Sequence, residues 1–274
     1  STVRNLVLSS SWACSATKRG PRIVGGSNAE RSEMPFIVSL TRRGGHFCGA
    51  TILNEKWLIT AGHCLCNGLN QIFKASHIKG IVGLHQFSTF KRDIPKGAQD
   101  WPFEVEFNQI FVHPKYECNK PYDDIALLAL TKPIRFSDHI KPACIPDGTS
   151  DGFENVLATV SGWGWTHENQ ELGDRADVLQ KAPVKVWENE QCQKSFIQNG
   201  KKMQIQNTQM CAGYEKGGID ACWADSGGPL VTENNVLIGV VSTGIGCARP
   251  NLPGIYTRVS KYSKWIESVI YTQK

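Results

Sequence analysis

The sequence lacks any long hydrophobic run, any Cys-x-x-Cys pair and any Asn-x-Ser/Thr sequon. A membrane-spanning helix needs roughly 18 or more consecutive apolar residues, and the longest runs here, near 125–130 and 236–241, are much shorter. The most closely spaced cysteines, Cys64 and Cys66, are too near each other in the chain for the usual zinc knuckle. We therefore expect no transmembrane segment, no zinc site and no N-linked glycan.

The sequence also lacks a concentration of charge of one sign. It has 30 Lys and Arg against 25 Asp and Glu, a net charge of +5, and the basic residues are scattered along the chain. A nucleic-acid-binding face needs clustered basic residues, so we expect no nucleic-acid partner. The chain of 274 residues, 41% hydrophobic and 20% charged, has the composition of a folded domain with one large core or two smaller ones.

Cysteine, by contrast, is abundant. The 10 cysteines are an even number, which favours disulfides and an oxidising compartment. We therefore expect a secreted, extracellular protein. Residues 1–11 are too polar for the core of a signal peptide, so we expect that such a signal was removed or lay further upstream.

Three separate segments carry candidate catalytic residues. Ser226 stands between Asp225 and a Gly-Gly-Pro turn, where a serine most often only caps the turn. A base and an acid are nevertheless present elsewhere: His63 lies in Thr-Ala-Gly-His-Cys, and Asp124 lies in Asp-Asp-Ile-Ala-Leu-Leu. With these segments in this order, the chain resembles the trypsin-like (chymotrypsin-family) serine proteases, from Ile23 to its end.

The three residue types suit nucleophilic catalysis. A serine hydroxyl is a weak nucleophile until a base takes its proton, and the imidazole of His63 titrates near neutrality, so it can accept and return that proton. Asp124 would hold the other ring nitrogen and stabilise the imidazolium. Asp123 is an alternative acid, and the resemblance selects Asp124. The other six histidines lack such a context, and we interpret them as structural or surface residues.

The resemblance implies an oxyanion hole made by the backbone amides of Ala224 and Ser226. Family members normally have glycine at the position of Ala224. Alanine keeps the amide donor, but it adds a methyl group where substrates and inhibitors approach, and its φ is less free. We expect a milder loss of transition-state stabilisation than removal of a donor would cause, and weaker binding of protein inhibitors.

The resemblance also places Asp220 at the base of the substrate pocket. A buried carboxylate there selects Arg or Lys through charge and hydrogen bonds, although an aspartate after Gly-Gly-Ile can be a simple turn residue. Gly244 and Gly254 would leave the pocket walls open, and Trp223 would overhang the rim.

The segment Ser242-Thr243-Gly244 would form another part of the substrate-binding surface. The family usually has an aromatic residue at the position of Thr243. Its absence leaves the preferences beyond the first substrate residue open.

Short apolar runs broken by Gly, Asn and Pro predict an all-β chain. The runs are 36–40, 47–53, 57–60, 78–84, 104–112 and 125–130, with later strands near 156–164, 236–242 and 254–258. The resemblance implies two packed antiparallel six-stranded β-barrels, at about 36–130 and about 145–258, joined by the proline-rich stretch 131–146.

One helix is expected at about 260–271. Ser260 is its expected N-cap. An apolar stripe at helical spacing should pack on the barrels, and it consists of Tyr262, Trp265, Ile266, Val269 and Ile270.

Residues 1–22 are polar and end in a basic stretch before Arg22, which is typical of an exposed protease target. The next residues, Ile-Val-Gly-Gly from Ile23, match the mature N-terminus of the family, so Arg22–Ile23 is expected to be an activation bond between a pro-segment, 1–22, and a protease domain, 23–274. The new ammonium of Ile23 would pair with Asp225, whose buried charge is costly without a partner. An ordinary strand start is the alternative. Because an Asp220 pocket would accept Arg22, we expect activation by another protease or by the enzyme itself.

The resemblance implies four disulfides, the first of which would tether the pro-segment: Cys14–Cys144, Cys48–Cys64, Cys192–Cys211 and Cys222–Cys247. Cys66 and Cys118 remain, on loops that flank the cleft in the family, and we expect them to pair. Ala158 and Thr232 occupy positions where many family members carry another disulfide. The segment 83–86, which corresponds to the family's calcium loop, has no acidic side chain, so no metal and no other cofactor is implied.

Together these features predict a secreted serine endopeptidase zymogen that cleaves after Arg or Lys. The tethered pro-segment favours the catalytic part of a larger regulatory-cascade protease of the immune or clotting type. The expected partners are protein and peptide substrates and serpin- or Kunitz-type inhibitors. Two alternatives remain: a catalytically silent homologue that binds partners, which Ala224 favours, and a digestive trypsin, which Cys14 disfavours.

Overall fold

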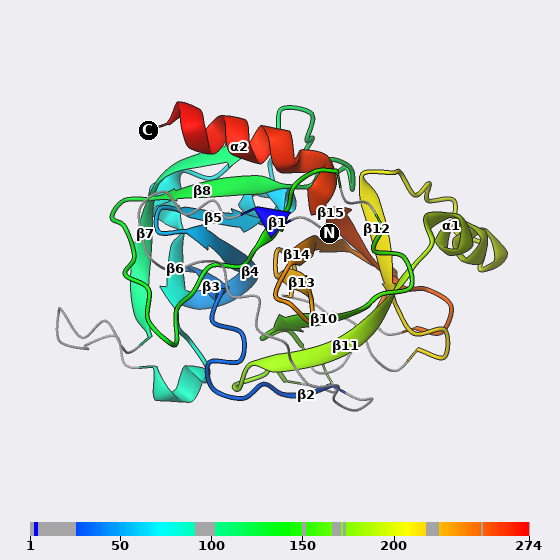
Figure 1. Cartoon of the computed structure of the whole chain (residues 1–274), viewed down its shortest axis with the longest axis horizontal. Helices are drawn as coiled ribbons and strands as arrows, with labels where there is room; N and C mark the ends of the chain where they lie inside the picture. Colours follow the sequence, from blue (N-terminus) through cyan, green and yellow to red (C-terminus); the bar gives the residue numbers. More distant parts are fainter. Residues whose placement is uncertain are drawn as a thin grey trace.

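The elements of the chain form two β-barrels that lie side by side, with helix α2 (Ser263–Thr272) lying across the first (Figure 1). The structure is a computed structural model and describes residues 3–4, 26–90, 102–149, 152–165, 171, 174–217, 225–247 and 249–273. The predicted all-β, two-barrel fold is confirmed. No helix in these ranges is both long enough and apolar enough to cross a membrane.

Six antiparallel strands close the first barrel in the order β3-β4-β5-β8-β7-β6. Their bounds are β3 Ile37–Arg42, β4 Gly45–Asn54, β5 Trp57–Thr60, β6 Lys79–Val82, β7 Phe103–Val112 and β8 Ala126–Leu130. All residues of β8 are buried, as its uninterrupted apolar sequence predicts for a strand that is covered on both faces. Each of these strands coincides with an apolar run in the sequence.

The second barrel is formed by strands β10 to β15. Their bounds are β10 Leu157–Gly162, β11 Gln180–Trp187, β12 Gln209–Gly213, β13 Pro229–Thr232, β14 Leu237–Thr243 and β15 Gly254–Arg258. The order is β10-β13-β14-β15-β12-β11, and β10 also pairs with β11, which closes the barrel. Ala158 and Thr232 are direct cross-strand partners. They are therefore close enough for the disulfide seen in many family members, which neither side chain can form.

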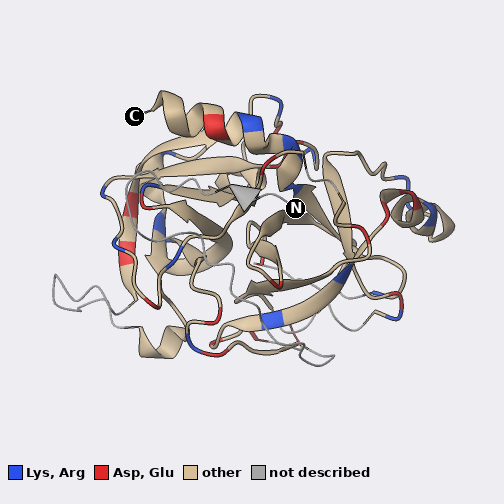
Figure 2. Cartoon of the chain, in the orientation of Figure 1, with Lys and Arg blue, Asp and Glu red and all other residues tan. Residues whose placement is uncertain are grey.

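Within the described ranges, three short strands lie outside the barrels. Strand β2 (Ser27–Asn28) adds to the edge of β11. Strand β9 (Ile145–Pro146), in the connection between the barrels, pairs with β1 (Val3–Arg4). The beginning of the chain therefore lies against the connection, directly after Cys144. Acidic and basic residues are interspersed over the described elements, without a basic stripe (Figure 2).

Helix α1 (Asn189–Gln198) was not predicted from the sequence. Its buried residues are only Cys192, Ser195 and Phe196, so its apolar stripe is too narrow to stand out in a polar segment. The disulfide Cys192–Cys211 fastens it to β12. The described part of the chain also contains four short 3-10 helices: η1 Gly62–Leu65, η2 Ala75–His77, η3 Phe87–Thr89 and η4 Val259–Tyr262.

The expected N-cap of the last helix is wrong. Ser260 lies inside η4, and α2 begins only at Ser263. The 3-10 turn runs directly into the α-helix, so the boundary carries no side-chain cap. The apolar stripe is confirmed: Tyr262, Ile266 and Ile270 are buried in the core of the first barrel.

We expect Ile266→Ala to destabilise the fold strongly, because Ile266 is fully buried between α2 and the first barrel. A substitution of this kind costs about 2–5 kcal/mol, which lowers the midpoint of thermal unfolding by roughly 2–4 °C per kcal/mol in a domain of this size. Calorimetry or dye-monitored melting measures it. Lys264→Ala, on the exposed face of the same helix, should leave the midpoint nearly unchanged. Equal losses in the two variants would contradict this packing.

Candidate active site

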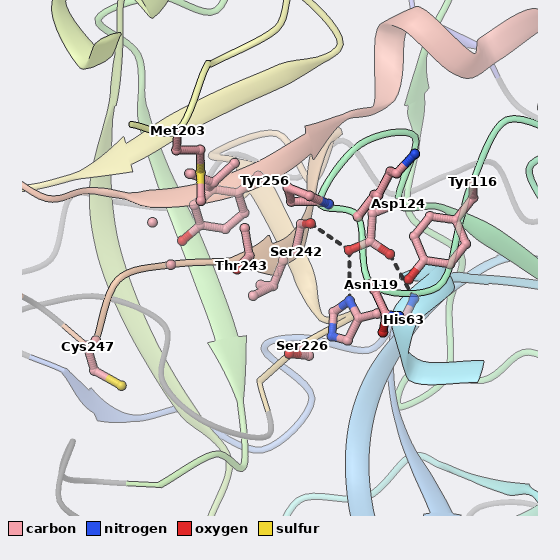
Figure 3. Close-up of a pocket in the computed structure, with 17 residues that line it drawn as sticks. His63, Tyr116, Asn119, Asp124, Met203, Ser226, Ser242, Thr243, Cys247 and Tyr256 are labelled. Carbon is pink, nitrogen blue, oxygen red and sulfur yellow. Dashed lines mark hydrogen bonds and ion pairs between the residues drawn. The ribbon is translucent and has the colours of Figure 1, made fainter. Parts of the chain in front are cut away.

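A cavity of about 440 Å³ lies between the two barrels. Its lining residues come from η1, from the loop between β7 and β8, from strands β14 and β15 with their connection, and from the segments after α1 and before β13 (Figure 3). They include His63, Tyr116, Asn119, Lys120, Pro121, Asp124, Met203, Ser226, Ser242, Thr243, Gly244 and Gly254. The three candidate catalytic residues, distant in the sequence, therefore meet at one site.

Asp124 is buried at the wall of this cavity, with 2% of its surface exposed. Its Oδ1 accepts the backbone N–H of His63 at 2.8 Å, and its Oδ2 accepts His63 Nδ1–H at 2.7 Å and the Ser242 hydroxyl at 2.6 Å. Thr257 Oγ1 donates to the Asp124 carbonyl oxygen at 2.7 Å. A buried carboxylate needs such donors to offset its lost hydration, and these come from both barrels.

His63 lies between Asp124 and open solvent, with 35% of its side chain exposed. Burial lowers the pKa of His63, but the charge of Asp124 and the hydrogen bond to it outweigh this effect, so the pKa lies above its ordinary value of 6.5. The bond to Nδ1 leaves Nε2 as the nitrogen that can accept a proton from a nucleophile.

Ser226 faces His63 from the second barrel, on the side of the ring away from Asp124 (Figure 3). Its carbonyl oxygen accepts the N–H of Gly49 on β4 at 2.8 Å. The next residue, Gly227, has a φ of 78°, and a Cβ there would lie 2.5 Å from the Gly49 carbonyl oxygen. Only glycine allows this approach. The described residues show no direct Ser226–His63 hydrogen bond; such bonds often tighten only with substrate.

Two disulfides hold the loop that carries His63. Cys48–Cys64 joins it to β4, and Cys66–Cys118 joins it to the loop before Asp124. Both pairs are as expected from the sequence. Tyr116 reinforces the second link, since its ring packs against Gly62 so closely that a Cβ there would lie 2.8 Å away. Burial, followed by the charge of Asp124, raises the pKa of Tyr116.

Asp123, the alternative acid, points away from His63. Its Oδ1 accepts the Tyr262 hydroxyl at 2.8 Å and lies 3.8 Å from Nδ1 of His113. Its φ of 51° places the two consecutive carboxylates on opposite sides of the chain. The choice of Asp124 as the partner of His63 is therefore supported by geometry. Asp123 instead anchors the loop to η4.

Several expected site residues lie outside the described part of the chain. These are the oxyanion residue Ala224, the pocket residues Asp220 and Trp223, the activation residues Arg22 and Ile23, and the cysteines Cys14 and Cys222. Their expected partners are described: Cys144 and Cys247 are disulfide-bonded, and Asp225 Oδ1 accepts the N–H of Gly164 at 2.8 Å.

Among the expected substrate-binding residues, Ser242, Thr243, Gly244 and Gly254 all line the cavity. Ser242 has in addition a role that sequence reasoning missed, since its hydroxyl is bonded to Asp124. The wall residues Tyr116, Asn119, Lys120, Pro121 and Met203 were also missed. The first four residues lie shortly before Asp124 in the chain, and this proximity could have indicated that they line the site. No sequence signal pointed to Met203, which lies in the segment after α1.

One cluster near the site has the appearance of a metal centre but cannot act as one. The donor atoms of Cys48, His63 and Cys64 lie within 4.8 Å of one another. The two sulfurs are bonded to each other, so neither is available as the thiolate that a metal requires.

A Ser, His and Asp that meet between two β-barrels define a protein of the serine-protease class. The family model for Trypsin matches residues 23–266, and the chain belongs to this family.

The chain is similar to two longer proteins. The chain is 38% identical over 255 residues to "Serine proteinase stubble" of Drosophila melanogaster. The matched region covers 89% of this chain and 30% of that protein. It is 36% identical over 254 residues to "Transmembrane protease serine 11C" of Mus musculus. That match covers 91% of this chain and 54% of the mouse protein. The chain thus spans about a third to a half of the length of these relatives.

We expect Asp124→Asn to lower the pKa of His63 below 6.5, because it removes the charge that raises this pKa and leaves burial, which lowers it. NMR titration of the His63 ring protons, assigned with His63→Gln, measures the change. Asp123→Asn is the matched control and should leave the His63 pKa raised.

The wild-type shift also has a consequence for stability. A pKa raised on folding contributes stability that is complete below about pH 6.5 and is lost as the pH rises through the folded-state value. Asp124→Asn should reverse this part of the pH dependence, because a His63 pKa that is lowered on folding costs stability as the pH falls through about 6.5. A His63 pKa that stays above 6.5 in the variant would contradict the assignment.

Proposed function

We propose that the chain is a serine endopeptidase in which Ser226 is the nucleophile, His63 the general base and acid, and Asp124 the orienting acid. The observation that supports this most is that Asp124 holds His63 Nδ1 at 2.7 Å while His63 and Ser226 line the same cavity. This leaves Nε2 on the side of the ring nearer Ser226.

In the proposed reaction, Ser226 Oγ attacks the carbonyl carbon of the substrate as its proton passes to His63 Nε2. The backbone amides of Ser226 and Ala224 stabilise the negative charge on the carbonyl oxygen. The proton then moves to the leaving amine, which departs and leaves an acyl-enzyme. Water, deprotonated by His63, attacks this ester and releases the acid and the free Ser226 hydroxyl.

The proposed substrates have Arg or Lys before the cleaved bond. Asp220 would bind the cationic side chain from the base of the pocket. In support, Gly244 lines the cavity, and no atom of the surrounding described residues lies closer than 3.5 Å to the place of a Cβ. Within that part of the chain, this wall leaves room for a long side chain.

The proposed regulation is activation by cleavage at Arg22–Ile23, by another protease or by the enzyme itself, with Ile23 then pairing with Asp225. A disulfide from Cys14 to Cys144 would retain the pro-segment, and the pairing of β1 with β9 beside Cys144 supports this path of the chain. Three disulfides among the described residues favour an extracellular location. We further propose a regulatory cascade as the setting, with serpin- or Kunitz-type inhibitors as partners.

We expect the protein to hydrolyse chromogenic peptides that end in Arg but not those that end in Phe. This activity should appear only after cleavage at Arg22–Ile23. Ser226→Ala should lower kcat by about 10⁶-fold, and Asp220→Ser should remove the preference for Arg because it removes the anion that recognises it. Steady-state kinetics before and after verified cleavage measures both. A cleaved wild-type protein that is inactive and is not labelled by an organophosphonate would instead support the catalytically silent alternative.

We expect Ala224→Gly to raise kcat/KM modestly and to tighten binding of a Kunitz-type inhibitor, because it removes a methyl group beside the oxyanion. The gain should be smaller than the roughly 10²–10³-fold effect of a whole oxyanion donor. Kinetics and inhibition constants for the two proteins measure it. If neither value changes, Ala224 has no effect on catalysis or inhibitor binding.

A further inference from the structure

A second cavity, of about 230 Å³, lies apart from the catalytic one and shares no lining residue with it. It is enclosed by the segment after β2, the turn after β6, the connection between the barrels, and the residues before β7 and β11. We call it the rear cavity. Its lining residues are Arg31, Ser32, Met34, Gly83, Leu84, His85, Pro102, His139 and Leu179.

The polar groups of the rear cavity are cationic or capable of becoming so. They are Arg31, His85 and His139, with the hydroxyl of Ser32, and no carboxylate is among the described residues that line the cavity. Within the described part of the chain, Arg31 has no ion-pair partner. The nearby Glu33 is instead occupied by Lys181, at 2.6 Å.

The remaining walls are apolar and fixed. Met34, Leu84 and Leu179 are each buried, with 3–4% of their surface exposed. An occupant must therefore satisfy positive groups at one end and place an apolar part against these side chains.

Hydrogen bonds hold the backbone at His85 and the ring of His139, whereas the side chain of Arg31 lies exposed. The His85 carbonyl oxygen accepts the N–H of Leu179 at 2.8 Å and Trp163 Nε1–H at 3.3 Å. His139 Nδ1 is hydrogen-bonded to the Ser32 hydroxyl. Binding would therefore require little reordering of the His85 backbone and of the His139 ring.

The electrostatics of the rear cavity favour an anion. Burial and the charge of Arg31 both lower the pKa of His85, which means that a further positive charge is disfavoured there. A bound anion would offset the repulsion between Arg31 and a protonated His85, and would thereby raise the pKa of His85.

We propose that the rear cavity is a binding site for an organic carboxylate with a short apolar tail. Arg31 binds the carboxylate, His85 and His139 donate hydrogen bonds to it, and the tail lies against Met34, Leu84 and Leu179. A carboxylate fits better than a phosphate, because one permanent cation faces a largely apolar wall.

Hexanoate is a suitable probe, titrated into the full chain while the ring C–H signals of its histidines are followed by NMR. We expect saturable shifts at His85 and His139 and none at His77, which lies outside both cavities. Hexan-1-ol and hexylammonium, which share the tail but lack the anion, should bind at least tenfold more weakly. Arg31→Gln should weaken hexanoate binding by tenfold or more.

Arg43→Gln removes an exposed arginine outside the rear cavity, and it should leave the affinity unchanged. Non-saturable shifts, equal binding of hexylammonium, or an unchanged affinity in Arg31→Gln would each overturn the proposal. Inorganic phosphate that binds while hexanoate does not would overturn the assignment of the ligand class, since the apolar wall would then have no role.

Discussion

A carboxylate inside a protein loses its hydration, and Asp124, 2% exposed, has its full set of hydrogen bonds only where both barrels meet. Two donors come from His63, which the first barrel carries, and one from Ser242 on β14 of the second. Separation of the barrels would therefore remove the Ser242 donor, whereas the two bonds from His63 lie within the first barrel. A hydrogen bond to a charged group contributes about 1.5–3 kcal/mol. The same contacts fix the tautomer of His63, so the requirement of the fold and the requirement of the chemistry coincide.

Glycine at the contact between the barrels places Ser226 relative to His63. A Cβ on Gly49 would lie 2.8 Å from the Gly228 Cα, and Gly227 adopts a φ that side chains disfavour. The backbones of β4 and of the Ser226 turn can thus approach closely enough for the Gly49–Ser226 hydrogen bond of 2.8 Å. Because β4 is also joined to the His63 loop through Cys48–Cys64, nucleophile and base are positioned from one common strand.

Sequence reasoning could predict what depends on local pattern. Apolar runs located the strands of the first barrel, and the motifs around His63, Asp124 and Ser226 identified residues that the fold brings together. Helix α1 was not predicted because its three buried residues, one of them a serine, do not make a visible apolar stripe in a polar segment. Ser260 was predicted to be a cap because a 3-10 turn cannot be told from the first helical turn by composition. The bond from Ser242 to Asp124 depends on the docking of one barrel on the other, which no local pattern encodes.

The cross-links are concentrated where small displacements matter most for chemistry. Of the three disulfides within the described ranges, two end on the His63 loop, and one of these reaches the loop that precedes Asp124. Tyr116 packs between the same loops. The raised pKa of His63 depends on its distance from Asp124, since burial alone would lower it. A loop free to move outward would weaken that attraction first and leave an imidazole that is a poorer base. The covalent links therefore preserve the basicity of His63 as well as the stability of the loop.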